Sequence, residues 1–188
     1  RTVDSFLLLT RVRHGKAEIP QSETCLIRDV LLDSYQGCRP MAVMHGVRLE
    51  LVLPDDDGID GAVMGNCDLL RTIFDNLIRN GIRFSPRDSV VSIVAAKDND
   101  PVTGERRISI SVRDRGPGIP AELLPRIFDR FSQSKEEERR GRGHGLGLEI
   151  AQGIAELHGG RITVSNVAEN GGGGAEFRVW LPMHIPQA

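Results

Sequence analysis

An alternating segment that ends in an acidic residue and a glycine-containing turn constrains this chain more than any other feature. From Ile108 to Val112 every second side chain is aliphatic, and this period of two predicts a strand with one apolar face. Asp114 falls on that same face, where a carboxylate is costly to bury unless hydrogen bonds compensate it. Gly116 and Gly118 follow at once, where a backbone without side chains lets a ligand approach closely. We therefore predict that the strand presents one acidic acceptor on the wall of a pocket.

The composition is that of a globular domain and excludes several classes of function. Hydrophobic residues make up 39% and charged residues 27% of the 188 residues, which is ordinary for a folded chain. The net charge of -2 excludes a globally basic nucleic-acid binder, and aromatic residues at 4% offer few platforms for stacking bases. No apolar run approaches the roughly 18 residues of a membrane span, and no signal peptide is visible. Because the chain opens on Arg1 without Met, we expect a fragment of a longer protein.

The cysteines and histidines give no metal or disulfide signal. Cys25, Cys38 and Cys67 form no CxxC pair and are odd in number, so we interpret them as free thiols of a reducing compartment. None of the five histidines has another histidine or a cysteine four residues away, so we interpret each as a surface or helix-end residue. His158 lies where a positive charge would suit the end of a helix.

Hydrophobic periodicity predicts an α+β fold. Expected helices cover residues 24–45, capped by Thr24; 66–82, capped by Asn66 or Asp68; 121–131; and 145–158. Expected strands cover residues 47–53, 62–64, 90–96, 107–114, 161–167 and 175–181, the last two joined as a hairpin around a glycine run. Residues 132–144 show no apolar period and are expected to form a mobile loop. These elements predict a two-layer α/β sandwich, with a mixed sheet and the helices packed on one face.

Two further segments are candidates for chemistry. On the helix at 66–82, the polar residues Thr72, Asn76, Asn80 and Arg83 fall roughly in line. They are either a solvated face or a site where amide oxygens meet a hard cation and Arg83 meets phosphate.

The second candidate is the glycine-rich loop at 141–148, which is either a flexible hinge or an anion site at a helix start. It is not a P-loop, because no Gly-Lys-Ser/Thr follows the glycines. In this loop and the charged segment before it, Arg139, Arg140 or Arg142 either stays solvated or reaches a phosphate when the loop closes.

Four short segments together resemble the N, G1, F and G2 boxes of the catalytic, ATP-binding domain of sensor histidine kinases, in the GHKL ATPase superfamily. They are residues 76–80 (NLIRN), 114–119 (DRGPGI), 127–131 (IFDRF) and 143–148 (GHGLGL). The resemblance covers about residues 24–184 and implies a Bergerat-type sandwich. It assigns residues 1–15 to the end of the second dimerisation and phosphoacceptor helix, 16–23 to a linker and 24–188 to the catalytic domain.

The resemblance also implies roles for individual residues. Asn80 would hold Mg²⁺, Asn76 would assist at the phosphates, Arg83 would contact phosphate, and these three would be the catalytic set. Asp114 would accept the adenine amino group. The remaining nucleotide contacts would be Phe84, Gly116, Gly118, Ile119, Arg142, Gly143, His144, Gly145, Leu146, Gly147 and Leu148, with an ATP lid over residues 129–144.

The chain departs from this family pattern in three ways. No histidine lies in a His-Glu/Asp-x-x-x-Pro setting, so the fragment alone is expected to bind ATP without phosphorylating itself. Gln133 stands where many relatives have an arginine, which puts a γ-phosphate contact in doubt. Gly81 replaces the more usual alanine, which weakens the helix by up to about 1 kcal/mol.

The favoured function is therefore a histidine kinase module that binds Mg·ATP and phosphorylates a histidine on a partner domain, for relay to a response regulator. A clamp ATPase is disfavoured, because Asn76 occupies the position of the glutamate base and an amide cannot take a proton from water. An anti-sigma type serine kinase and a degenerate docking domain stay open as alternatives. The resemblance implies a bacterial cytoplasmic domain, monomeric as a fragment and homodimeric at full length, with room for an inner-membrane anchor upstream.

Overall fold

The computed structural model describes residues 23–53, 62–99, 102, 104–129, 146–167 and 173–184. In chain order the elements are β1 (Glu23–Leu26), α2 (Ile27–His45), β2 (Arg48–Val52), β3 (Ala62–Gly65), α3 (Cys67–Phe84), β4 (Val90–Asn99), β5 (Arg106–Arg113), the 3-10 helix η1 (Leu124–Arg126), α5 (Gly147–Leu157), β6 (Arg161–Asn166) and β7 (Ala175–Pro182). The predicted segment 1–15, the predicted loop at 132–144 and all but the last residue of the linker at 16–23 lie outside the described residues, as does Gly145, the first residue of the helix predicted at 145–158.

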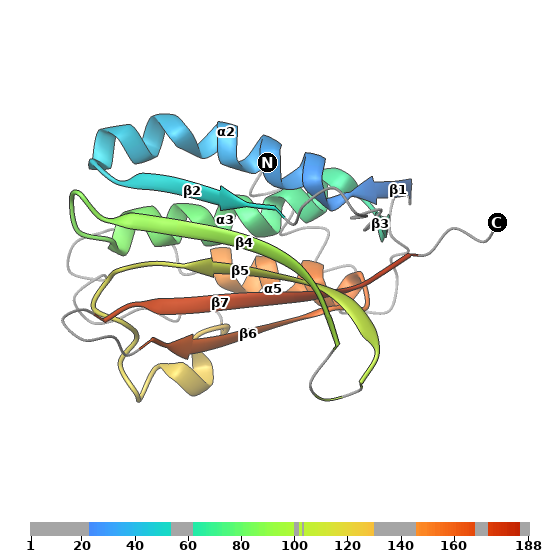
Figure 1. Ribbon diagram of the computed structural model, residues 1–188. Helices are drawn as coiled ribbons and strands as arrows, with labels where there is room; N and C mark the ends of the chain where they lie inside the picture. The colour runs from blue at the N-terminus through green and yellow to red at the C-terminus, as the bar shows by residue number, and fades with distance from the viewer. Residues whose placement is uncertain are drawn as a thin grey trace.

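The five-stranded sheet has the order β2-β4-β5-β7-β6, with α2, α3 and α5 packed on one face and a separate β1-β3 ribbon at one end (Figure 1). β2 runs parallel to β4, whereas β4-β5, β5-β7 and β7-β6 are antiparallel. The predicted two-layer sandwich with a mixed sheet is therefore confirmed. Within the described residues, no helix combines the length and the apolar character needed to cross a membrane.

The core lies between the sheet and the helices and follows the predicted periodicities. Ile108 and Ile110 of β5 are fully buried on the inner face of the sheet. The apolar stripe of α3 is also fully buried, and it consists of Leu70, Ile73, Phe74 and Leu77. Each such side chain stabilises the fold by about 1.5–3 kcal/mol. α3, the helix that bears the predicted asparagines, is thus fixed in the middle of the helical layer, between α2 and α5.

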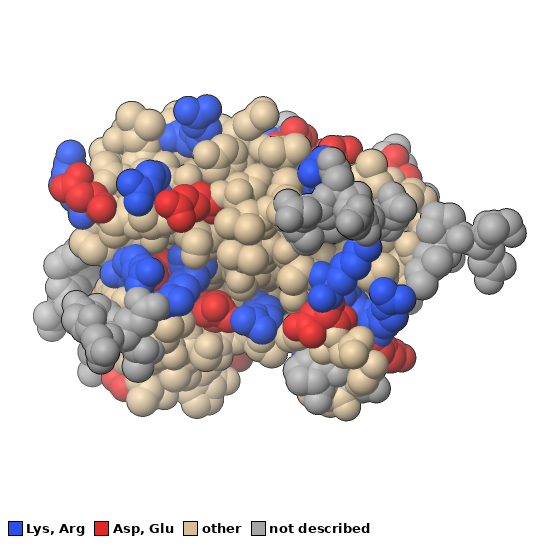
Figure 2. Space-filling model, viewed as in Figure 1, with Lys and Arg blue, Asp and Glu red and all other residues tan. Residues whose placement is uncertain are grey.

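The outer face of the sheet carries charges of both signs. Figure 2 shows Lys and Arg interspersed with Asp and Glu on the side of the molecule seen in Figure 1. Ion pairs between residues two positions apart on one strand include Arg48 with Glu50 at 3.4 Å and Arg178 with Glu176 at 2.7 Å. Exposed pairs of this kind contribute little to stability. The part of this face that the structure describes is therefore mixed in charge rather than a patch of one sign.

Two of the predicted helices have different boundaries in the structure, and for a third the structure selects one of two predicted caps. Thr24 lies in β1 rather than at a helix start, because residues 23–26 pair with β3, and α2 begins at Ile27. In the described part of the helix expected at 121–131, residues 121–129, only the three residues of η1 are helical, because Pro125 has no N–H for a helical bond and its ring would clash with the preceding turn. Of the two possible caps for α3, Asn66 is the one used, since its Oδ1 accepts the Leu69 N–H at 3.0 Å.

The interpretation of all three cysteines as free thiols is wrong for two of them. Cys25 and Cys67 form a disulfide with their Cα atoms 5.5 Å apart, and only Cys38 is a free, buried thiol. The pairing of β1 with β3 brings the strand that contains Cys25 beside the start of α3 at Cys67. A sequence separation of 42 residues carries no signal of this contact.

The interpretation of His158 as a positive charge at a helix end is also wrong. The side chain is only 4% exposed, and its Nε2 accepts the Asn66 N–H at 3.1 Å. Its Nδ1 lies 2.7 Å from the Ile154 carbonyl oxygen, so the ring is neutral with its proton on Nδ1. Burial lowers the pKa of His158, and the hydrogen bond to Ile154 opposes this effect.

Candidate functional site

The Asp114 carboxylate is buried and hydrogen-bonded, as the alternation predicts. It lies directly after β5 and is 6% exposed. Its Oδ1 accepts the Gly116 N–H at 2.8 Å and the Ala175 N–H at 3.1 Å. Burial raises the pKa of Asp114, while these two backbone hydrogen bonds act in the opposite direction. Among the described residues both donors reach Oδ1, which leaves Oδ2 for a donor from a ligand.

The two glycines of the turn after Asp114 are required by protein contacts. A Cβ on Gly116 would lie 2.8 Å from the Phe84 carbonyl oxygen and 3.1 Å from Asp114 Oδ1. Gly118 has a φ of +77°, in the left-handed region that side chains disfavour, and a Cβ there would lie 3.1 Å from Asn166 Oδ1. The sequence predicts close approach of a ligand at these glycines, and the close approach that the structure contains is to Phe84 and Asn166.

The end of the β6-β7 hairpin forms a second part of the site that the motifs do not indicate. Ala175, the first residue of β7, donates to the Asp114 carboxylate and accepts the Asp114 N–H at 3.0 Å. A Cβ on Gly174 would overlap the Asp114 carbonyl oxygen. Asn166, the last residue of β6, contacts the backbone of Ile119. The glycine run before Ala175 is the only sequence signal here, and it predicts a hairpin turn rather than contacts to Asp114.

The predicted asparagines lie one turn apart on α3, and both side chains are half-buried. A Cβ on Gly147 would lie 3.2 Å from Asn76 Oδ1, so Asn76 faces the start of α5. Asn80 Oδ1 accepts a hydrogen bond from Arg83 Nη2 at 2.9 Å. The Arg83 guanidinium lies 4.8 Å from the centre of the Phe84 ring, and Phe84 is 39% exposed. The structure thus brings Asn80, Arg83 and Phe84 together.

The remaining predicted residues divide into three groups. Thr72 uses its hydroxyl within its own helix, donating to the Asp68 carbonyl at 2.9 Å. Leu146, Gly147 and Leu148 form the start of α5, where the two leucines pack against the core. Arg142, Gly143, His144, Gly145 and Gln133 lie outside the described residues.

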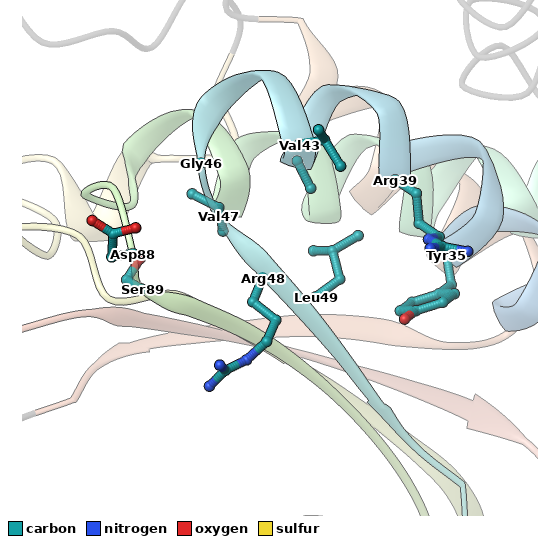
Figure 3. Close-up of a pocket in the computed structure, with 10 residues that line it drawn as sticks. Tyr35, Arg39, Val43, Gly46, Val47, Arg48, Leu49, Asp88 and Ser89 are labelled. Carbon is teal, nitrogen blue, oxygen red and sulfur yellow. The ribbon is translucent and has the colours of Figure 1, made fainter.

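A surface pocket of about 500 Å³ is separate from these residues. It lies between the end of α2 and the start of β2 (Figure 3). Tyr35 and Arg39 line one side, and Asp88 and Ser89 line the other. The pocket contains none of the predicted site residues and no buried acceptor comparable to Asp114. Chemistry therefore favours the Asp114 region as the functional site.

Comparison with known proteins identifies sensor proteins among the relatives of this chain. Sensor histidine kinase TrcS of Mycobacterium tuberculosis is 33% identical over 96% of this chain and 33% of its own length. Sensor protein KdpD of Clostridium acetobutylicum is 31% identical over 98% of this chain and 19% of its own length. This chain therefore spans a third or less of these two relatives.

Solved structures agree with the observed fold. Full-length ShkA in complex with AMPPNP matches 100% of this chain and 36% of its own, with a TM-score of 0.75 and 25% identity. The mycobacterial sensor histidine kinase MprB, at 22% identity, shares the fold with a TM-score of 0.71 over 86% of this chain and 97% of its own. The family described as histidine kinase-, DNA gyrase B-, and HSP90-like ATPase matches residues 65–185. Because that match covers more than half of the sequence, this chain belongs to the family of histidine kinase-, DNA gyrase B- and HSP90-like ATPases.

Proposed function

We propose that this chain is the ATP-binding catalytic domain of a sensor histidine kinase, which transfers the γ-phosphate of Mg·ATP to a histidine on another domain. The observation that carries this proposal is the buried Asp114 carboxylate, which two backbone donors fix beside the asparagine-bearing helix α3. Of the named relatives, TrcS is a sensor histidine kinase and KdpD a sensor protein, and one similar structure contains AMPPNP, which supports the same reading.

Asp114 is the base-recognising group in this proposal. Its Oδ2 accepts a hydrogen bond from the exocyclic amino group of adenine, while Oδ1 stays bound to the Gly116 and Ala175 N–H groups. Guanine presents a carbonyl oxygen at the equivalent position, which a carboxylate repels. The half-exposed Phe84 ring offers an apolar surface near the same nucleotide. The site thereby selects ATP over GTP.

Asn80, assisted by Asn76, is the proposed holder of Mg²⁺. Amide oxygens are hard ligands of the kind that Mg²⁺ accepts, and these two residues lie one helical turn apart, so the donor set fits the ion. When bound, Mg²⁺ supplies neutralisation of the phosphate charge. Asn80 Oδ1 accepts a hydrogen bond from Arg83, so the guanidinium lies beside the residue that would hold Mg²⁺ and would add positive charge near the phosphates. The backbone at the start of α5, from Leu146 to Leu148, lies on the phosphate side and favours an anion there.

The same proposal names the partners of the domain. Residues 1–15 are the end of a dimerisation and phosphoacceptor helix, 16–23 are a linker, and 24–188 are the catalytic domain. The phosphoryl acceptor is a histidine of the dimerisation domain, and the phosphate is relayed to a response regulator. The full-length protein is a homodimer that carries this domain in the cytoplasm, with its anchor, where one exists, in the inner membrane.

Phosphoryl transfer between separately made domains tests the proposal. Labelled Mg·ATP is added to this chain together with the phosphoacceptor domain of the same full-length protein. We expect labelled phosphate on that domain that is stable in base and labile in acid, as a phosphohistidine is. Acid-stable phosphate would instead indicate a serine kinase, and free phosphate without transfer would indicate an ATPase. Absence of ATP binding to this chain would overturn the nucleotide site itself.

A further inference from the structure

Asn166 makes a reciprocal pair of hydrogen bonds with the backbone of Ile119, in the turn that follows Asp114. The Ile119 N–H donates to Asn166 Oδ1 at 2.8 Å, and Asn166 Nδ2 donates to the Ile119 carbonyl at 2.8 Å. The primary amide of Asn166 thus pairs with Ile119 as a neighbouring peptide group would. The two residues are 47 positions apart in the sequence, so the tertiary fold creates this contact.

The strand pairing connects this contact to the carboxylate. Asn166 of β6 is directly paired with Ala175 of β7. Ala175 in turn donates to Asp114 Oδ1 at 3.1 Å and accepts the Asp114 N–H at 3.0 Å. Two cross-strand neighbours therefore hold the turn at both of its ends, Ala175 at Asp114 and Asn166 at Ile119. Gly118 fits closely under Asn166 Oδ1, which leaves the turn little freedom to shift.

We propose that Asn166 is a positioning residue for adenine recognition, which fixes the turn from Gly116 to Ile119 so that the Asp114 carboxylate meets the base. Asn166 acts through Ile119 and does not touch the nucleotide. This inference rests on the proposed function of Asp114 as the adenine acceptor. Because the Asn166 side chain lies at the surface, water replaces its hydrogen bonds when it is removed, and the sheet below keeps its packing. The effect of its loss therefore falls on nucleotide selection rather than on folding.

Calorimetric titration of ATP and GTP into three variants tests this role. Asn166→Ala removes both hydrogen bonds, so nucleotide binding must itself order the turn, and ATP binding should weaken about tenfold. GTP binding should stay at the parent value, because GTP has no amino donor for Asp114 at that position. Ser165→Ala, an exposed neighbour on the same strand, is the matched control and should bind both nucleotides like the parent. Asn80→Ala, on the phosphate side, should weaken both nucleotides together.

A second substitution of Asn166 and a second measurement separate the role of this side chain from a general effect on folding. Asn166→Asp retains the acceptor for the Ile119 N–H and loses the donor to the Ile119 carbonyl. Hydrogen exchange of the Ile119 amide should therefore accelerate in Asn166→Ala and stay slow in Asn166→Asp, whose ATP affinity should fall between that of Asn166→Ala and the parent. If the parent chain does not bind ATP, the proposed function fails. If the parent binds ATP and the ATP to GTP preference is unchanged in Asn166→Ala and Asn166→Asp, the role of Asn166 is refuted.

Discussion

Substitution of Asp114 by asparagine isolates the single oxygen to which we assign base recognition in the proposed function. The asparagine has nearly the same shape, and its Oδ1 can still accept the Gly116 and Ala175 N–H groups at 2.8 and 3.1 Å. The change therefore leaves the internal hydrogen bonds of the turn in place. It replaces Oδ2, the proposed acceptor for adenine, by an NH₂ group that only donates.

The expected loss of affinity follows from the kind of hydrogen bond removed. A hydrogen bond to a charged group contributes about 1.5–3 kcal/mol, so ATP binding to Asp114→Asn should weaken by about 10- to 150-fold. GTP binding should strengthen, because the new NH₂ group donates to the guanine carbonyl that the carboxylate repels. The ratio of ATP to GTP affinity should therefore fall further than the ATP affinity alone.

The same substitution should change how stability depends on pH. Burial raises the pKa of Asp114, so the folded chain holds this proton more tightly than the unfolded chain does. The free energy of unfolding is then greatest below the unfolded pKa and decreases as pH rises toward the raised folded value. Asparagine has no proton to lose, so the free energy of unfolding of Asp114→Asn should depend less on pH across this acidic interval. At neutral pH it should melt at the parent temperature or above it.

Calorimetry and thermal denaturation between pH 4 and 8 measure both effects. Asp98→Asn is the matched control, because Asp98 is exposed near the end of β4 and undergoes the same chemical change. An Asp114→Asn variant that folds and binds ATP like the parent would refute the adenine acceptor. A variant that melts well below the parent at neutral pH would refute the argument that the buried charge is a net cost.

Three further results are expected. Asn80→Ala should abolish the Mg²⁺ dependence of ATP binding, and magnesium titrations that match the parent would exclude Asn80 as the ligand. Cys25→Ser removes the disulfide that spans 42 residues. The chain-entropy relation gives a loss of about 4 kcal/mol and a melting temperature lower by roughly 10 °C. A reductant should lower the melting temperature of the parent but not of this variant, and equal responses would contradict the bond. Because burial lowers the pKa of His158, the unfolded chain takes up its proton first. The free energy of unfolding should therefore decrease as pH falls below about 6.5. His158→Gln should remove that slope, and an unchanged slope would assign it to other groups.

The local pattern of the sequence determined the elements and the identity of the acceptor. Side-chain alternation in β5 and the apolar stripe of α3 depend on neighbours two to four residues away, and both are buried as predicted. The Asn66 cap acts within its own first turn, and so it is readable from the sequence. Asp114 was recognisable because its position in the alternation conflicts with its charge. The order of the four motifs then indicated which ligand resolves that conflict.

Only the tertiary structure decided which distant groups complete the site. The disulfide joins residues 42 apart, Asn166 meets Ile119 over 47 positions, and His158 accepts from Asn66 over 92. Such contacts are set by strand register and helix packing, and the local periodicity of a sequence carries no information about either. The same pattern that reveals a half-buried strand does not reveal which strand lies beside it. For this reason the sequence identified Asp114, while the fold supplied Ala175 and Asn166 to hold it in place.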